Sequence, residues 1–90
     1  MEIGAHILVS GLVQGVGFRY FAYHWGSKLG LKGFVRNRYS GEVELDVEGD
    51  RSLIEEFIKQ LKVGPRASRV SDLKVTWKEK EKNYEHFEVY

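Results

Sequence analysis

The chain has 90 residues, of which 42% are hydrophobic and 30% are charged, and this is typical of one globular domain with a single core. The net charge of +1 argues against nucleic-acid binding through bulk electrostatics, and the absence of cysteine excludes thiol nucleophiles and zinc–thiolate sites. No apolar run is long enough to cross a bilayer and no signal-peptide pattern is present, so we expect one cytoplasmic domain over residues 1–90 without membrane or nucleic-acid partners.

A strand, a glycine-rich loop and a helix are predicted at the start of the chain. Residues 5–12 (AHILVSGL) are apolar and partly β-branched, which is typical of a buried strand. Residues 11–17 are too rich in glycine to favour regular structure. From Phe18 the apolar residues recur every three or four positions, which predicts a helix that stops at Gly30.

Two further strands are predicted on either side of a turn. Residues 32–39 form the second strand, and Tyr39-Ser40-Gly41 is a turn signal. Residues 42–48 form the third strand, in which apolar and acidic residues alternate. The apolar positions are Val43, Leu45 and Val47, and the acidic positions are Glu42, Glu44, Asp46 and Glu48. This alternation predicts one buried face and one solvated face.

A second helix and a fourth strand complete the pattern. Asp50 or Ser52 can cap the helix, which ends at Val63-Gly64-Pro65. Its predicted apolar face consists of Leu53, Ile54, Phe57, Ile58 and Leu61. Residues 72–78 alternate as a fourth strand, and residues 84–90 add a short final one. The order βαββαβ predicts a ferredoxin-like α+β sandwich, with two helices packed on one face of a mostly antiparallel sheet.

The glycine-rich loop between the first strand and the first helix has the features of a phosphate-binding site. Glycines at positions 11, 15 and 17 let backbone N–H groups approach a ligand, and the helix that follows directs its free N–H groups to the same place. Arg19 adds a planar fork that matches two phosphate oxygens. The spacing differs from both the Walker A loop and the dinucleotide fingerprint. Taken alone, such a loop is equally compatible with a tight connection that binds nothing.

Two motifs resemble the signatures of the acylphosphatase family. Residues 9–19 (VSGLVQGVGFR) match an aliphatic residue, any residue, Gly, any residue, then Val-Gln-Gly-Val-any-Phe-Arg. Residues 33–37 (GFVRN), followed by Gly41, Val43 and Gly49, match the second signature. The resemblance extends over the whole chain, including its length, its strand order and its aromatic C-terminus.

This resemblance implies an enzyme that hydrolyses small-molecule acyl phosphates to a carboxylate and inorganic phosphate. By analogy with the family, Arg19 binds the phosphoryl group together with the loop amides, and Asn37 positions the attacking water. The amides concerned are those of Gly15, Val16, Gly17, Phe18 and Arg19. Arg38 departs from the family pattern, in which many members have Thr after the Asn. We expect a monomer that needs no cofactor.

Metal binding and histidine chemistry are not expected from the sequence. The four acidic residues of the third strand share one face, a spacing more typical of a solvated surface than of a cation site. His6, His24 and His86 lie in different elements without metal-ligand spacing. Only His24, on the first helix, lies near the predicted site, and a phosphohistidine mechanism there is a remote alternative.

Two other function classes remain as alternatives. Aromatic residues on the predicted strands suggest an RNA-binding sheet of the RRM type, although the partial motif Lys32-Gly33-Phe34 lies on the second strand rather than the third. The aromatic residues concerned are Phe34, Tyr39, Trp77, Tyr84 and Phe87. The other alternative is a phosphate-binding module without activity, as found inside larger maturation enzymes, whereas a chain that stands alone favours the enzyme.

The C-terminus offers one further hypothesis. The final predicted strand can lie beside the first one, which would bring the terminal carboxylate of Tyr90 to Arg19. A frayed terminus is the simpler expectation. The acyl group of the physiological substrate is not indicated by either motif.

Overall fold

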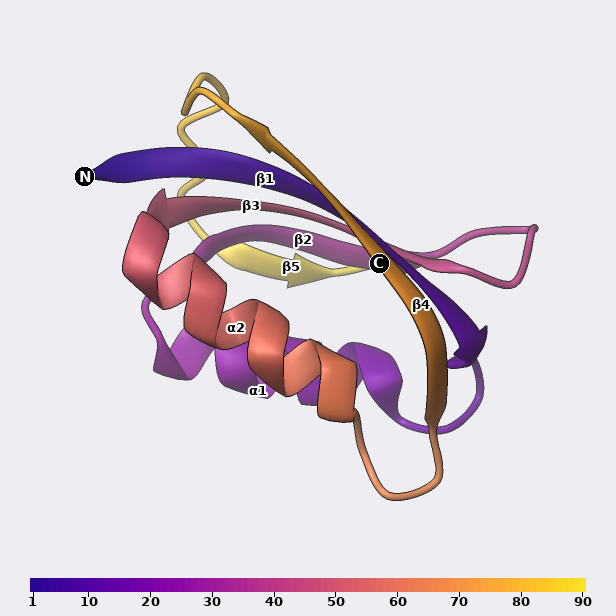
Figure 1. Ribbon diagram of the computed structural model, residues 1–90. Helices are drawn as coiled ribbons and strands as arrows, with labels where there is room; N and C mark the ends of the chain where they lie inside the picture. The colour runs from indigo at the N-terminus through magenta and orange to yellow at the C-terminus, as the bar shows by residue number, and fades with distance from the viewer.

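Five strands form one sheet in the order β4-β1-β3-β2-β5. The computed structural model describes residues 1–90, and its strands are β1 (Glu2–Leu12), β2 (Lys32–Asn37), β3 (Val43–Asp50), β4 (Arg69–Lys78) and β5 (Phe87–Val89). All neighbouring strands are antiparallel except β5, which runs parallel to β2. The helices α1 (Phe18–Lys28) and α2 (Arg51–Val63) lie side by side on one face of this sheet (Figure 1). The predicted ferredoxin-like α+β fold is confirmed.

The core lies between the helices and the covered face of the sheet. Alternate residues of the central strands β1 and β3 point into it, and each of them is fully buried. These residues are Ala5, Ile7 and Val9 on β1, and Val43, Leu45 and Val47 on β3. The helices contribute the apolar residues of their inner faces, among them Phe18, Ala22, Ile54, Phe57 and Leu61. The alternating apolar residues of the strands and the apolar residues spaced three or four apart in the helices therefore form one common core.

The ends of several elements differ from the sequence-based expectation. β1 begins at Glu2, because its pairing with β3 continues to Asp50. β2 ends at Asn37 rather than at Tyr39, and Arg38 N–H closes the turn by donating to the carbonyl of Glu42 at 2.9 Å. Asp50 caps α2 as predicted, since its carboxylate accepts from Ser52 N–H at 2.9 Å.

Three further elements, α2, β4 and β5, also differ in detail from the prediction. Leu53 was predicted on the buried face of α2, but it remains 39% exposed because it lies at the border of that face. β4 begins at Arg69, earlier than predicted, and its pairing with β1 shifts register between Ser10 and Gly11. β5 is shorter than predicted.

The acidic face of β3 is buried, so the prediction of a solvated face is wrong. Glu44, Asp46 and Glu48 are only 9%, 4% and 2% exposed. The segment between β4 and β5 folds over this face, where backbone N–H groups of Glu81 and Lys82 donate to Glu48 at 3.0 and 2.8 Å. The alternation predicted two faces correctly, but it could not show that a distant segment covers the second one.

Ion pairs and hydrogen bonds compensate the buried carboxylates. Asp46 accepts from the Tyr84 hydroxyl at 2.6 Å and pairs with Lys78 Nζ at 2.7 Å. Burial, followed by the hydrogen bond to Asp46, raises the pKa of the Tyr84 hydroxyl. Glu44 lies between His6, at 2.7 Å, and Arg36. Burial alone would raise the pKa of Glu44, but the hydrogen bonds from these two neighbours outweigh it and hold the pKa below its usual value.

The aromatic residues do not form a single platform of the RRM type. Phe87 is buried beneath the helices, with its ring centroid 6.1 Å from that of Phe57. Phe34 and Tyr84 form a pair at 6.2 Å on the opposite face of the sheet. Neither helix combines the length and the apolar character needed to span a membrane.

Candidate active site

The two sequence motifs meet at one cavity of about 370 Å³. The cavity lies between the β1–α1 loop, the start of α1, the end of β2 and β5. Its lining residues are Val13, Gly15, Gly17, Phe18, Arg19, Tyr20, Asn37 and Val89. Arg19 and Asn37 are therefore brought together from separate elements.

The β1–α1 loop presents free backbone N–H groups to this cavity. Gly15 and Gly17 have φ angles of +74° and +81°, a left-handed conformation that favours glycine. Gly17 is the N-cap of α1, and neither a capping side chain nor an acidic residue occupies the first turn. The first intrahelical bond runs from Phe21 N–H to the carbonyl of Gly17 at 3.0 Å, so the preceding helical N–H groups have no helical acceptor. The positive end of the helix dipole therefore faces the cavity.

Arg19 contributes the only basic side chain of the cavity lining. Its Nη1 donates to the backbone oxygen of Tyr90 at 2.6 Å. None of the ion pairs of the molecule involves Arg19, so its charge is not neutralised by an acidic side chain. A guanidinium in this position is available to an anion.

Asn37 is the last residue of β2, and its side chain ends in an unusual environment. The Oδ1 atom is buried and has no hydrogen-bond partner. Buried polar atoms are almost always paired, so an orphaned acceptor on a cavity calls for a ligand or a water molecule. Asn37 can therefore accept a hydrogen bond from a molecule that enters the cavity.

Gln14 holds the loop against the turn that follows Asn37. Its Nε2 donates to the carbonyl of Arg38 at 2.7 Å and to the carbonyl of Glu42 at 2.9 Å. The side-chain amide of Gln14 thus holds the glycine-rich loop at a fixed distance from the end of β2. Sequence reasoning assigned no role to Gln14, although its fixed position in the first motif was a signal.

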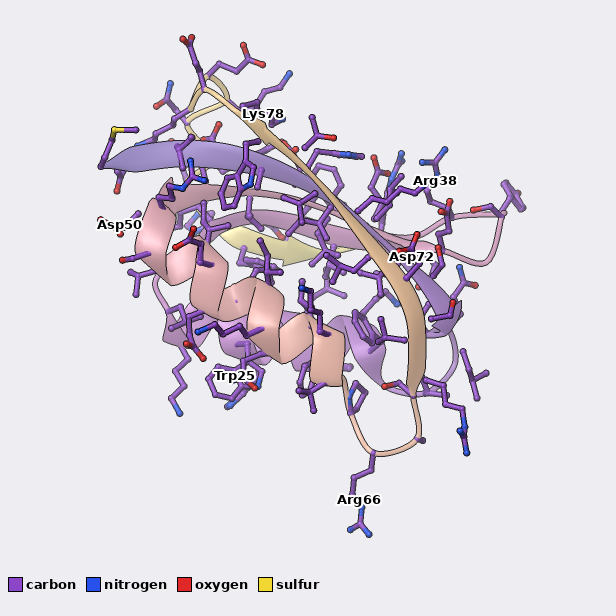
Figure 2. The ribbon with its side chains drawn as sticks, in the orientation of Figure 1. Trp25, Arg38, Asp50, Arg66, Asp72 and Lys78 are labelled. Carbon is purple, nitrogen blue, oxygen red and sulfur yellow. The ribbon has the colours of Figure 1, made fainter.

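The side chains of several other residues considered from the sequence lie outside the cavity lining. Val16 is half-buried and packs against the core rather than lining the cavity. His24 is exposed on α1 and is not part of the lining, and His6 pairs with Glu44. The side chain of Arg38 points away from the helices (Figure 2). Nowhere do three or more His, Cys, Asp or Glu side chains gather in a metal-binding arrangement.

Comparison with known proteins shows to which family the chain belongs. The family model described as acylphosphatase matches residues 5–89. The chain belongs to the acylphosphatase family. The acylphosphatase of Moorella thermoacetica is 47% identical over 77 residues, which cover 86% of this chain and 83% of that protein. The acylphosphatase of Caldanaerobacter subterraneus is 39% identical over 90 residues, which cover both chains completely.

The fold of a solved acylphosphatase agrees equally well. The crystal structure of acylphosphatase from Bacillus subtilis superposes with a TM-score of 0.95 at 36% identity, covering 98% of each chain. The present chain is accordingly an enzyme that hydrolyses an acid anhydride, the bond between a carboxyl group and phosphate in a small-molecule substrate.

Proposed function

We propose that Arg19 and the backbone N–H groups of residues 15–19 hold the phosphoryl group, while Asn37 positions the attacking water. The observation that supports this division most strongly is the buried, unpaired Oδ1 of Asn37, a residue that lines the same cavity as Arg19 and the loop. The oxygen of a side-chain amide accepts a hydrogen bond from water but does not bind an anion, whereas the guanidinium and the backbone N–H groups of the loop can only donate. Arg19 and the loop amides therefore suit the phosphoryl group, and the side-chain oxygen of Asn37 suits the attacking water.

The proposed reaction is an in-line displacement at phosphorus. The water oxygen forms a new bond to phosphorus while the bond from phosphorus to the carboxyl oxygen breaks, and the electron pair leaves with the carboxylate. The water proton passes to a non-bridging phosphate oxygen. Because a carboxylic acid has a pKa of about 4, the leaving group departs without a general acid. The protein has to position the reactants and stabilise the charge on the phosphoryl oxygens.

Hydrolysis of benzoyl phosphate by wild type and variants tests these roles. Arg19→Ala removes a charged donor, so kcat/KM should fall at least on the order of a hundred- to a thousandfold. Arg66→Ala is the matched control, because Arg66 projects into solvent from the α2–β4 loop (Figure 2). Near wild-type turnover by Arg19→Ala would contradict the proposal.

Asn37→Ala separates water positioning from phosphate binding. This variant should lower kcat while inorganic phosphate inhibits with nearly unchanged affinity, since the loop and Arg19 remain in place. A large loss of phosphate affinity would instead place Asn37 in the anion site.

We further propose that no metal or other cofactor takes part, since Arg19 and the loop amides can supply the charge stabilisation that a cation would provide. Turnover should then be the same with and without EDTA. Loss of activity in the chelator that returns with a divalent cation would contradict this.

We also propose that residues 1–90 act in the cytoplasm as a monomeric single domain that binds neither nucleic acid nor membranes. The near-neutral net charge and the absence of cysteine support this. Light scattering should give a mass near 10.4 kDa that does not depend on concentration. A larger species at assay concentrations would contradict the monomer.

A further inference from the structure

The cavity lining combines polar groups with two partly exposed apolar side chains at its mouth. The polar groups belong to the loop, to Arg19 and to Asn37, whose Oδ1 is buried and unpaired. Tyr20, in the first turn of α1, and Val89, on β5, line the same cavity but remain 76% and 37% exposed. These two side chains therefore provide apolar surface where the cavity meets solvent.

In-line geometry determines which part of the substrate faces this mouth. The attacking water and the leaving oxygen lie on opposite sides of phosphorus. If the water is held at the buried Oδ1 of Asn37, the acyl group must project from the interior towards the mouth. It then meets Tyr20 and Val89. This step depends on the proposed role of Asn37.

Tyr20 has no packing role that would explain its position. No other aromatic ring pairs with it, although other aromatic side chains of α1 do take part in such pairs. Tyr23, for example, packs edge-to-face on Phe87 at 6.1 Å. An exposed aromatic ring beside a polar site is a typical recognition surface, since it buries apolar area without losing much conformational entropy.

We propose that Tyr20 and Val89 form the subsite for the acyl group, and that they favour acyl phosphates with a bulky apolar acyl group. Neither residue carries a charge, and the one basic residue of the cavity, Arg19, is engaged by the phosphoryl group. A charged acyl group therefore finds no partner here, whereas an aromatic or branched aliphatic group buries its surface against the ring of Tyr20 and the methyl groups of Val89.

The test compares benzoyl phosphate with acetyl phosphate, which carry a large and a minimal acyl group on the same phosphoryl group. For Tyr20→Ala, the ratio of the kcat/KM values for the two substrates should fall roughly tenfold, because apolar contacts discriminate by about this factor or more. Val89→Ala should lower the ratio less. Tyr20→Phe should retain the preference, since the ring rather than the hydroxyl makes the contact.

Tyr39→Ala is the matched control, because Tyr39 is fully exposed in the β2–β3 turn and does not line the cavity. The subsite would be overturned if Tyr20→Ala left the ratio of kcat/KM values unchanged, including the case in which kcat/KM falls equally for both substrates. Loss of the preference for benzoyl phosphate in Tyr20→Phe would also overturn it. Failure of the proposed function is distinguishable, since it would appear as full activity of Arg19→Ala on both substrates or as a large loss of phosphate affinity in Asn37→Ala, whatever the ratio in Tyr20→Ala.

Discussion

Arg19 and Tyr90 are joined by a hydrogen bond of 2.6 Å between Nη1 and the backbone oxygen of Tyr90, across 71 positions of the chain. Tyr90 is itself held in place, because its N–H donates to the carbonyl of Val35 at 2.9 Å and its ring packs on Phe34 at 5.7 Å. The contact between Tyr90 and Arg19 that the sequence suggested is therefore present, but the expected strand neighbour was wrong, because β5 lies beside β2 and not beside β1. The hydrogen bond from Arg19 to Tyr90 orients the guanidinium that we propose to bind the phosphoryl group.

Deletion of Tyr90 should weaken phosphate binding and lower kcat/KM for benzoyl phosphate by roughly tenfold, since a hydrogen bond to a charged group is lost. The readouts are the inhibition constant for inorganic phosphate and the rate. Tyr90→Ala keeps a backbone oxygen at this position and should be affected less. Equal effects of the two changes would show that the ring, and not the oxygen, is what matters.

Gln14→Glu should damage both the stability and the rate. The new carboxylate oxygen would face the carbonyls of Arg38 and Glu42, which now accept from the amide at 2.7 and 2.9 Å. Leaving these acceptors without a donor should cost about 1–3 kcal/mol of unfolding free energy, and kcat should fall because Asn37 is displaced from the loop. Urea denaturation and steady-state kinetics measure the two effects. Wild-type values of both would show that the turn is held without this amide.

Glu48→Gln should destabilise the protein without touching the cavity. Glu48 is 2% exposed, and its oxygens accept from backbone N–H groups of the β4–β5 connection, including that of Tyr84 at 3.3 Å. An amide turns one of these acceptors into a donor, so the unfolding free energy should fall by about 1–3 kcal/mol in a urea titration. Glu85→Gln, an exposed change in the same segment, is the control. Equal stability of the two variants would argue against anchoring by Glu48.

Acid should weaken the protein partly through Asp50. The hydrogen bond from the Ser52 side chain, followed by that from the N-terminal amine, lowers the pKa of this carboxyl from 3.8 to about 2. Because the pKa is lower in the folded state, the stabilisation is present above about pH 4 and is lost as the pH falls towards about 2. Asp50→Asn keeps a capping side chain but cannot titrate, so its stability should fall less over this range. An unchanged acid profile in this variant would assign the loss to other carboxylates.

The elements that follow from local chemistry could be predicted from the sequence. The alternation in β3 and the three-to-four-residue spacing in α1 reflect one core, and Asp50 caps α2 because its short side chain reaches the N–H of Ser52. The cradle at Gly15 and Gly17 could be proposed because left-handed glycines before a helix expose N–H groups.

The relationships between distant segments could not be predicted in this way. Nothing in the alternation around Glu48 shows that the β4–β5 connection would cover it. The meeting of Arg19 with Asn37 was expected only from the family resemblance, since it depends on how β2 lies beside α1. The bridge made by Gln14 depends on the conformation of two loops at once, and no local pattern encodes it.

The position of β5 couples catalysis to the least protected part of the sheet. This strand spans only Phe87–Val89, lies at the edge, and is anchored mainly through the buried ring of Phe87. Fraying of the residues after Phe87 opens few buried contacts, so it requires far less free energy than global unfolding. Each such opening would release Arg19 and remove Val89 from the cavity mouth. Under warm or mildly denaturing conditions, activity should therefore fall with the fraction of molecules in which this edge is closed, before the core unfolds.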